Sequence, residues 1–346
     1  MILSVAPMMD WTDEHCRSFH RALSRGAWLY TEMVTTQAIL HGDRSRLLGR
    51  GEEGDRVVLQ LGGSDPAALA QCARIGESYG YQAINLNCGC PSDRVVQGAF
   101  GACLMARPSQ VAEGVAAMKD AVGVPVTVKH RIGIDHVEDY AFVRDFVGIV
   151  GRAGCSHFIV HARNAWLDGL SPKENREVPP LRYDVVHRLA ADFPDYRFEI
   201  NGGLQSLAQG IEAAAGLAGA MFGRFAYHQP YALSEVDELL AAPVGIAGAT
   251  NAAAAAVPAS RAAGRIGRSD VVEAMARYLL ARRSRGVEVR HLARHMLGLY
   301  HGEPAARRWR QMLSDSESLG MNDAGLLLRA RDVVEAAARR PLAEAA

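Results

Sequence analysis

The chain has 346 residues, of which 49% are hydrophobic and 22% are charged, and its formal net charge is zero. This length suits one large domain and one small domain. No uninterrupted apolar run is long enough to span a bilayer, and no basic segment precedes an apolar one at the N-terminus, so we expect a cytoplasmic protein. The six cysteines are too sparse for a disulfide framework, and no second close Cys or His pair completes a metal site beside Cys88 and Cys90. We expect reduced thiols and no bound metal.

The zero net charge is a cancellation between parts of the chain. Residues 1–240 carry 22 Lys and Arg against 28 Asp and Glu, whereas residues 241–310 carry 12 against 4 and residues 311–346 carry 4 against 6. A basic segment attached to a mildly acidic body favours a polyanionic partner, because Lys and Arg that neutralise phosphates release counterions. A solvated helix face is the alternative, and on charge alone it is preferred.

Eight short runs of β-type composition alternate with helical stretches in the first 240 residues. The runs are Leu3–Ala6, Trp28–Thr31, Val57–Leu61, Ala83–Leu86, Val126–His130, His157–Val160, Arg197–Ile200 and Gly219–Phe222. Helical stretches such as Asp65–Tyr79, Pro108–Val122 and Ser206–Ala214 begin with residues typical of helix starts. Eight βα units in this length fit a (β/α)₈ TIM barrel better than a doubly wound sheet, because such barrels have about 250 residues. We therefore predict an α/β barrel over residues 1–240.

The chain changes character after the predicted barrel. Residues 241–269 are rich in Ala and Gly and read as a linker. Residues 270–346 predict a small all-helical domain, because apolar residues recur at helical spacing in Val271–Arg283, His291–Tyr300 and Leu326–Ala338. A basic surface is expected there, formed by Arg290, His291, Arg294 and His295 opposite Leu292, Met296 and Leu299, and continued by Arg307, Arg308, Trp309 and Arg310.

One cysteine lies in the loop that follows the fourth predicted strand. The run is Ile84-Asn85-Leu86-Asn87-Cys88-Gly89-Cys90-Pro91-Ser92. Loops at the C-terminal ends of barrel strands carry the chemistry of barrel enzymes. Asn87 can both donate to and accept from a base edge, and Gly89 and Pro91 favour a tight turn that presents Cys90. A buried structural cysteine is the alternative.

Polar and glycine residues follow most of the other predicted strands. They are Pro7, Met8 and Met9 after strand one, Gln60 on strand three, Lys129 on strand five, His161 after strand six, Asn201-Gly202-Gly203 after strand seven and Gly223-Arg224 after strand eight. The last two turns, with the charge of Arg224, form the phosphate site that barrels build at this position. Gln60 suits a pyrimidine edge, and Lys129 would stabilise negative charge on a reduced flavin. The alternatives are a salt-bridged lysine for Lys129 and a hydrogen-bonded strand-end histidine for His161. The occurrence of both residues together with both glycine turns favours a flavin.

Several long motifs occur together in one order. They are Ala6-Pro-Met-Met-Asp-Trp-Thr-Asp, Asn87-Cys-Gly-Cys-Pro-Ser-Asp-Arg-Val, Phe100-Gly-Ala-Cys-Leu-Met, Lys129-His-Arg-Ile-Gly, His161-Ala-Arg-Asn-Ala-Trp-Leu and Asn201-Gly-Gly. From residue 4 to about residue 315, the chain resembles the tRNA-dihydrouridine synthase family. The insert at residues 169–181 is similar to that of the A-type bacterial subfamily, which the resemblance links to uridines 20 and 20a of the tRNA D-loop.

The resemblance implies roles for matching positions. FMN would be held by Pro7, Met8, Met9, Gln60, Lys129, His161, Asn201, Gly202, Gly203, Gly223 and Arg224. Cys90 matches the catalytic cysteine, and Asn87 matches a residue near the target uridine. The segments of Lys173, Arg176, Arg294 and His295 would meet tRNA. Cys88 departs from the family pattern, since an apolar residue such as Val is expected there.

The implied reaction reduces the C5=C6 bond of uracil. Hydride passes from reduced FMN to C6, and Cys90 gives a proton to C5, after NADPH or NADH has reduced the flavin. The uridine must flip out of the tRNA to reach the barrel. A monomer is expected. An FMN-dependent barrel reductase of a small-molecule pyrimidine or enone is the alternative, although it needs no basic helical domain. A non-catalytic RNA-binding module would need neither Lys129 nor Cys90.

Overall fold

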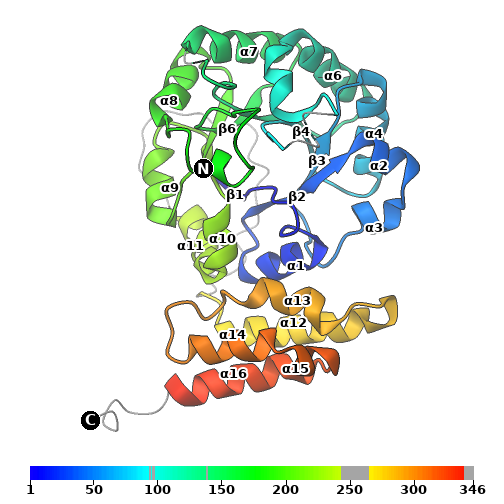
Figure 1. Ribbon diagram of the computed structural model, residues 1–346, viewed down its shortest axis with the longest axis vertical. Helices are drawn as coiled ribbons and strands as arrows, with labels where there is room; N and C mark the ends of the chain where they lie inside the picture. Colours follow the sequence, from blue (N-terminus) through cyan, green and yellow to red (C-terminus); the bar gives the residue numbers. More distant parts are fainter. Residues whose placement is uncertain (93–94, 96–97, 138, 243–264, 339–346) are drawn as a thin grey trace.

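Eight parallel strands close into a barrel whose strand order follows the sequence (Figure 1). The computed structural model describes residues 1–92, 95, 98–137, 139–242 and 265–338. The strands are β1 (Ile2–Val5), β2 (Trp28–Thr35), β3 (Val57–Gly62), β4 (Ala83–Cys88), β5 (Val126–Arg131), β6 (His157–His161), β7 (Arg197–Asn201) and β8 (Gly219–Phe222). Because β1 pairs with both β2 and β8, the sheet has no free edge. The predicted barrel is confirmed.

A ring of helices surrounds the strands. It comprises α1 (Glu14–Leu23), α2 (Thr36–His41), α3 (Arg44–Leu48), α4 (Pro66–Ser78), α6 (Pro108–Ala121), α7 (Tyr140–Arg152), α8 (Tyr183–Asp192), α9 (Leu207–Ala213), α10 (Arg224–His228) and α11 (Val236–Ala241), with the 3₁₀ turns η1 (Gly101–Ala106), η2 (Glu174–Arg176) and η3 (Pro230–Glu235). The side chains of Asp13, Asp65, Asp139 and Ser206 accept backbone N–H bonds at the starts of α1, α4, α7 and α9. These polar caps fix where the helices begin.

The second strand is longer than the sequence predicts. The expected strand ends at Thr31, whereas β2 continues to Thr35 after a register shift between Tyr30 and Met33. Glu32 breaks the apolar pattern of this segment, so the sequence pattern predicts a shorter strand. Its carboxylate accepts the backbone N–H of Asp10 in the loop after β1. The irregularity therefore connects β2 to a loop at the barrel mouth.

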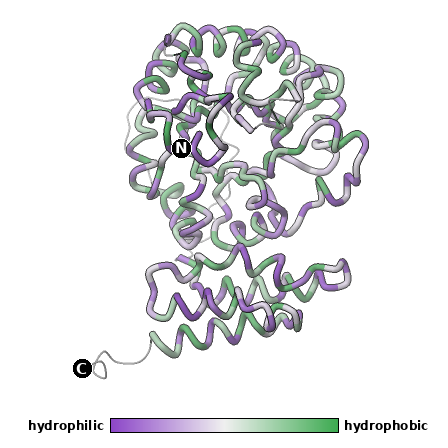
Figure 2. Tube along the Cα trace, viewed as in Figure 1, coloured by the Kyte–Doolittle hydropathy of each residue, from purple (hydrophilic) through white to green (hydrophobic). Residues whose placement is uncertain are grey.

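The main hydrophobic core lies between the strands and the ring of helices. Val126 and Val128 of β5 face outward into this core, and the intervening Thr127 belongs to the barrel interior. A smaller cluster inside the barrel comprises Ala6, Tyr30, Val58, Ala83, Ile159 and Met221. Figure 2 shows hydrophobic and hydrophilic residues alternating along the surrounding helices. Because little of the interior is apolar, polar side chains fill the remaining space near the strand ends.

A helical unit follows the barrel and packs against it. Its elements are α12 (Arg268–Arg282), η4 (Arg283–Arg285), α13 (Val289–Met296), α14 (Ala306–Ser314), α15 (Ser316–Gly320) and α16 (Gly325–Ala338). Helices α12 and α13 lie against α1 (Figure 1). Residues 243–264 of the expected linker lie outside the described residues, and α12 begins before the predicted domain start at 270. No helix in the described part of the chain is long and apolar enough to cross a membrane.

The expected basic surface of the helical unit needs a correction at Trp309. Its indole is fully buried, and Nε1 donates to the backbone oxygen of Met296 at 2.8 Å. Trp309 is therefore a core residue that holds α14 against α13, whereas its neighbours Arg307, Arg308 and Arg310 are exposed. The three neighbouring arginines make this segment basic in the sequence, although the helical spacing directs the indole into the core.

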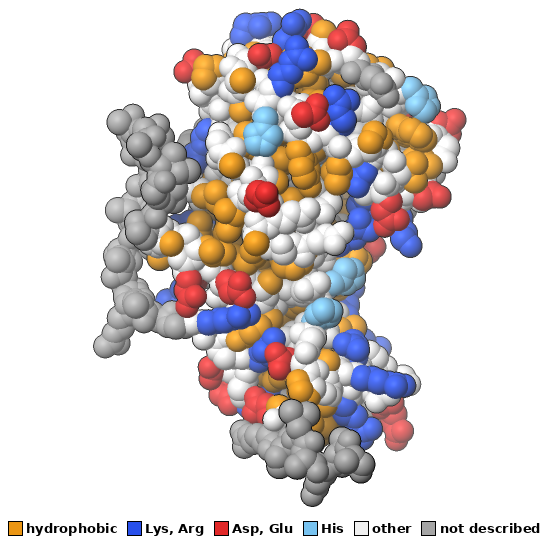
Figure 3. Space-filling model, turned by 90° about the vertical axis from the view of Figure 1, so that its left-hand side faces the viewer, with side chains coloured by type: hydrophobic (Ala, Val, Ile, Leu, Met, Phe, Trp, Pro, Cys, Tyr) orange, Lys and Arg blue, Asp and Glu red, His pale blue; other side chains and the backbone are white. Residues whose placement is uncertain are grey.

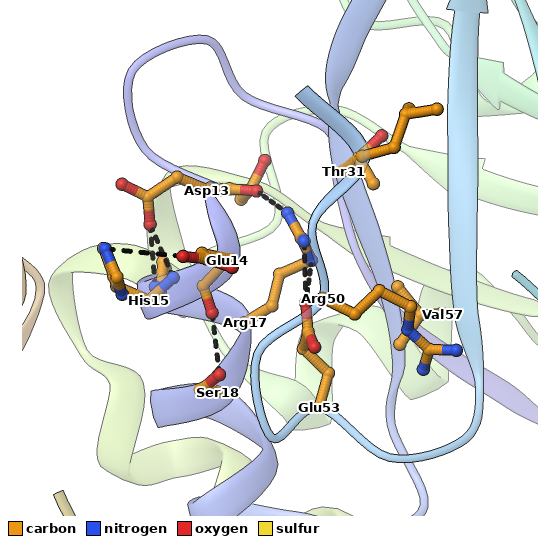
Figure 4. A network of polar contacts seen from close by, with 12 residues as sticks. Asp13, Glu14, His15, Arg17, Ser18, Thr31, Arg50, Glu53 and Val57 are labelled. Atoms are coloured by element: carbon orange, nitrogen blue, oxygen red, sulfur yellow. Dashed lines mark hydrogen bonds and ion pairs between the residues drawn. The ribbon is translucent and has the colours of Figure 1, made fainter. Parts of the chain in front are cut away.

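An ion pair is buried beneath the first turn of α1 (Figure 4). Arg17 donates to Glu53 Oε1 through Nη2 at 2.7 Å and through Nε at 3.0 Å, and a third bond reaches the backbone oxygen of Thr12. Burial opposes the charge of Arg17, but Glu53 raises the pKa of the guanidinium above its ordinary value. This pair fixes the loop after β1 to the segment before β3.

Removing one partner of this pair is expected to destabilise the protein more than removing both. Glu53→Leu leaves the Arg17 guanidinium buried without an anion, so the free energy of unfolding falls by about 3–5 kcal/mol. In Arg17→Met/Glu53→Leu no unpaired charge is left buried, so most of the lost free energy of unfolding is recovered. Urea unfolding of both variants measures the difference. A double variant as unstable as Glu53→Leu would contradict this account.

Candidate active site

Asn87 shapes the loop that carries Cys90. Its side-chain Oδ1 accepts the backbone N–H groups of Gly89 and Cys90, both at 3.0 Å. The backbone oxygen of Cys90 accepts the N–H of Ala102 at 2.9 Å, which joins the loop to η1. Gly101 has a φ of +72° at this junction, and a side chain there would meet Cys90 and Val95. The loop is therefore held from both sides, and the Cys90 thiol is partly exposed at the strand end.

The two neighbouring cysteines have different environments. Cys88 is the last residue of β4 and is fully buried in the main core. Burial raises the pKa of its thiol far above the ordinary value. Cys90 is partly exposed, and its sulfur lies 3.6 Å from Ser92 Oγ. Of the two thiols, that of Cys88 is enclosed in the core, and Cys90 is the one with an exposed surface.

A chain of amide hydrogen bonds extends from Asn87 into the barrel. Asn87 Nδ2 donates to Gln60 Oε1 at 2.8 Å, and Gln60 Nε2 donates to Asn85 Oδ1 at 2.8 Å. Asn85 in turn donates to Thr127 Oγ1. An amide has two donor hydrogens and two acceptor lone pairs, so Gln60 retains one of each for a ligand. Asn87, expected beside the target uridine, is 8% exposed and so contributes mainly to this internal chain.

Lys129 points across the barrel mouth from β5. Its Nζ donates to Asn201 Oδ1 at 3.0 Å, and Asn201 donates to the backbone oxygen of Met221. Burial, together with the nearby charge of Arg131, lowers the pKa of Lys129 to about 7. An anionic ligand beside Nζ would therefore favour protonation of the lysine.

His161 and the glycine turn after β7 form the next part of the wall. A side chain on Gly202 would approach His161 Cδ2 to 2.6 Å, and one on Gly203 would approach Leu181 to 2.4 Å. Both glycines also have positive φ values, of +115° and +67°. Burial lowers the pKa of His161 well below its ordinary value, and the surrounding arginines and Lys129 act in the same direction. These surroundings therefore favour the neutral imidazole.

Arg131 joins the loop after β4 to the connection between β6 and α8, a role that the sequence pattern does not predict. The residue is 3% exposed. It donates to the backbone oxygens of Gly89, Asn164 and Asn175 at 3.1, 3.0 and 2.9 Å. Its position two residues after Lys129, on the same side of β5, was the available signal.

The insert between β6 and α8 reaches the expected phosphate site. Arg224, the first residue of α10, donates to Glu177 Oε1 of the insert at 2.5 Å. Asn175 is fully buried and organises the insert through bonds to the backbone of Trp166 and Leu170. Arg176 is exposed, and partial desolvation together with the nearby charge of Arg224 lowers its pKa. The structure thus brings two arginines together beside the turn at Gly223.

The loop after β1 completes the ring of candidate residues. Pro7 and Met8 are partly buried, whereas Met9 is 55% exposed. Thr12 Oγ1 bonds to both the backbone N–H and the backbone oxygen of Met8. These bonds fold the loop back on itself, so that Met8 lies about 3.8 Å from the Cβ position of Gly223. The ends of β1 and β8 are therefore adjacent at the site.

The four expected tRNA contacts lie in different environments. Lys173 and Arg176 are exposed on the insert, and the Arg294 side chain is 48% exposed. The side chain of His295 has no exposed area, because it is enclosed between α13 and the barrel. A buried imidazole does not reach tRNA directly, so the expected contact by His295 disagrees with the structure. The helical spacing from His291 suggested exposure, but packing against the barrel covers this position.

The lowered pKa of Lys129 predicts a specific pH dependence of stability. Between pH 7 and about 10.5 the unfolded chain binds a proton at this lysine that the folded protein does not, so the free energy of unfolding rises with pH. This one group contributes at most about 1.4 kcal/mol per pH unit. Urea unfolding without cofactor should show the rise in wild-type protein relative to Lys129→Met. The exposed Lys173→Met is the control, and equal slopes in wild type and Lys129→Met would refute the prediction.

Comparison with known proteins is consistent with this geometry. The family model "Dihydrouridine synthase (Dus)" matches residues 4–337. The chain is 54% identical to the tRNA-dihydrouridine(20/20a) synthase of Pseudomonas syringae pv. tomato, over 90% of this chain and 87% of that protein. The protein of the same name from Escherichia coli K12 is 50% identical over 96% of this chain and 91% of its own length.

A solved structure supports the fold independently. The 2-naphthoyl-CoA reductase complex with 2-naphthoyl-CoA aligns with a TM-score of 0.53 and 12% identity, covering 68% of this chain and 50% of that chain. At this identity the likeness concerns the barrel fold alone. The family match over most of the chain and the identity to full-length relatives are far more specific. The chain belongs to the dihydrouridine synthase family.

Proposed function

We propose that this protein is an FMN-dependent tRNA-dihydrouridine synthase that reduces D-loop uridines 20 and 20a. The observation that carries the proposal is the partly exposed Cys90, held by Asn87 at the same barrel mouth as Lys129. A proton donor and a cation facing one site suit the reduction of a conjugated double bond. Relatives that are 50–54% identical carry the name tRNA-dihydrouridine(20/20a) synthase.

The residues at the barrel mouth fit a flavin. Gln60 retains a donor and an acceptor for a pyrimidine edge, and Lys129 offers a cation beside it. A Cβ at Gly223 would meet nothing closer than 3.8 Å, so the backbone beside Arg224 is open to a phosphate. Arg163 Nε is buried and has no hydrogen-bond partner among the described residues. We assign Pro7, Met8, Met9, His161, Asn201, Gly202 and Gly203 to the remainder of the FMN site.

The chemistry of the site follows from these groups. When bound, FMN reduced by NADPH or NADH supplies the hydride for C6 of the uracil. Cys90 would donate the thiol proton to C5, so the C5=C6 bond gains a hydride at C6 and a proton at C5, and the thiolate regains a proton from solvent. Lys129 stabilises negative charge on the cofactor. Arg131 holds the Cys90 loop by its bond to the oxygen of Gly89.

The proposed tRNA surface differs from a uniform basic face. Figure 3 shows Lys and Arg interspersed with Asp and Glu over the barrel and the helical unit. Three arginines of residues 265–294 pair with barrel carboxylates, as Arg265–Glu235, Arg282–Glu14 and Arg294–Asp13. Within the described part of the chain, six others have no carboxylate within 4 Å: Arg277, Arg283, Arg285, Arg307, Arg308 and Arg310. These six, with Lys173 and Arg176, are the proposed phosphate contacts.

The function is tested with purified protein and unmodified tRNA. The protein should be yellow with non-covalent FMN, and dihydrouridine should form at positions 20 and 20a when NADPH is present. Failure to take up FMN would refute the flavin proposal. If the reduced flavin were reoxidised by small enones or free pyrimidines but not by tRNA, the small-molecule reductase would be the correct function.

Arg224→Ala is expected to weaken FMN binding. A charge-assisted phosphate contact contributes roughly 1.5–3 kcal/mol, which corresponds to about a 10- to 150-fold higher dissociation constant. Fluorescence titration of the apoprotein with FMN measures the change. Arg144→Ala is the matched control, because Arg144 lies on the outer helix α7 and pairs with its neighbour Asp145. Unchanged affinity in Arg224→Ala would remove this residue from the site.

Cys90→Ala should retain FMN and tRNA binding while dihydrouridine formation slows by about 10²–10⁴-fold, the usual cost of losing a general acid. Cys88→Val should have nearly wild-type activity, because the buried Cys88 side chain is replaced by an apolar group of similar size. Single-turnover reoxidation of the reduced flavin by tRNA separates the chemical step from binding. A large defect in Cys88→Val with normal stability would reverse the assignment of the acid.

A further inference from the structure

The first turn of α1 supplies polar contacts to both leading helices of the helical unit. Asp13 Oδ2 accepts from Arg294 Nη2 at 2.5 Å and lies 3.1 Å from His295 Nε2. The next residue, Glu14, lies 3.7 Å from Arg282, and His15 Nδ1 lies 2.8 Å from the hydroxyl of Tyr278. Figure 4 shows Asp13, Glu14 and His15 together at the start of this helix. Three consecutive residues therefore face α12 and α13.

The same cluster reaches the candidate active site through aromatic rings. Tyr227 of α10 places its hydroxyl 3.1 Å from His295 Nδ1. Trp11, in the loop that carries Pro7, Met8 and Met9, stacks on Tyr227 with ring centroids 4.3 Å apart and an interplanar angle of 13°. His295 thus contacts residues next to both the β1 and the β8 ends of the barrel mouth.

The surroundings of Asp13 favour its ionised carboxylate. Burial by itself would raise the pKa of its carboxyl, but the hydrogen bond from His295 and the charge of that residue lower the pKa well below its usual range. Asp13 also caps α1 by accepting the N–H groups of His15 and Cys16. One carboxylate therefore ends the loop after β1, starts α1 and holds α13.

We propose that Asp13 is a positioning residue for tRNA, which fixes the helical unit against the barrel so that tRNA bound by the unit's arginines is aligned with the barrel mouth. This inference rests on the proposed function. Asp13 does not touch substrate, and it acts through His295 and Arg294. Without the contacts of Asp13, the barrel and the helical unit would move relative to each other. When one of them already holds a tRNA, the other would then meet that tRNA at a lower effective concentration.

The test replaces Asp13 with residues that preserve the helix cap. Asp13→Ser keeps a cap acceptor, because Ser and Asp are equivalent at this position, but its hydroxyl is too short to bridge to His295. Asp65→Ser is the matched control, since Asp65 caps α4 away from the helical unit. Steady-state dihydrouridine formation with unmodified tRNA is measured, together with FMN content, thermal melting and NADPH oxidation without tRNA.

In Asp13→Ser we expect KM for tRNA to rise by about 10- to 100-fold, because the two parts no longer engage one tRNA together, with kcat at saturating tRNA, FMN content and tRNA-free NADPH oxidation near wild type. Asp65→Ser should leave KM unchanged. His295→Ala should raise KM similarly, and the double variant should not add to either single change. A wild-type KM in Asp13→Ser, or a loss confined to melting temperature, would overturn the inference.

Asp13→Asn, which keeps the shape of the side chain, provides the same test if the serine variant does not fold. It should show an intermediate rise in KM, and a wild-type KM in a folded Asp13→Asn protein would also overturn the inference. Wild-type protein that forms no dihydrouridine would refute the proposed function instead, so the two failures are distinguishable.

Discussion

The side chain of Asn87 is the interaction on which the candidate site depends most. Its oxygen holds the backbone of Gly89 and Cys90, and its nitrogen bonds to Gln60. The position of the thiol is thereby coupled to the amide expected to bind a pyrimidine edge. An aspartate at this position would keep the turn but would lose the donor to Gln60. Asparagine supplies both the acceptor for the turn and the donor to Gln60, so these two bonds explain the residue type without a contact to substrate.

The interior of the barrel is polar near the strand ends because parallel strands point alternate side chains inward, and eight of them leave little apolar volume. Gln60, Asn85 and Thr127 satisfy one another, and Lys129 is satisfied by Asn201. The main hydrophobic core lies outside the barrel, between the strands and the helices. A wall built of internally bonded amides is rigid, so a ligand at the mouth meets donors and acceptors that are already oriented.

The sequence predicts the strands, the cysteine loop and the glycine turns well, because each depends on local composition: apolar runs, a proline after Cys90, and paired glycines. It does not predict which polar residues become partners across the fold. His295 and Trp309 have basic neighbours, and only the packing of α13 against α1 and α14 shows that both are buried. The role of Arg131 in joining the loop after β4 to the β6–α8 connection likewise depends on oxygens from distant segments.

The opposite charges of the barrel and the helical segment have a structural explanation as well as a functional one. Part of the arginine excess of residues 265–294 is matched by Asp13, Glu14 and Glu235 of the barrel. Such pairs fix how two units meet more than they add to stability, since partly exposed ion pairs contribute about 0–1 kcal/mol. Only the arginines left over are free to bind phosphates. The charge asymmetry of the sequence therefore encodes an orientation between two parts of the protein, and the remaining arginines form the proposed tRNA surface.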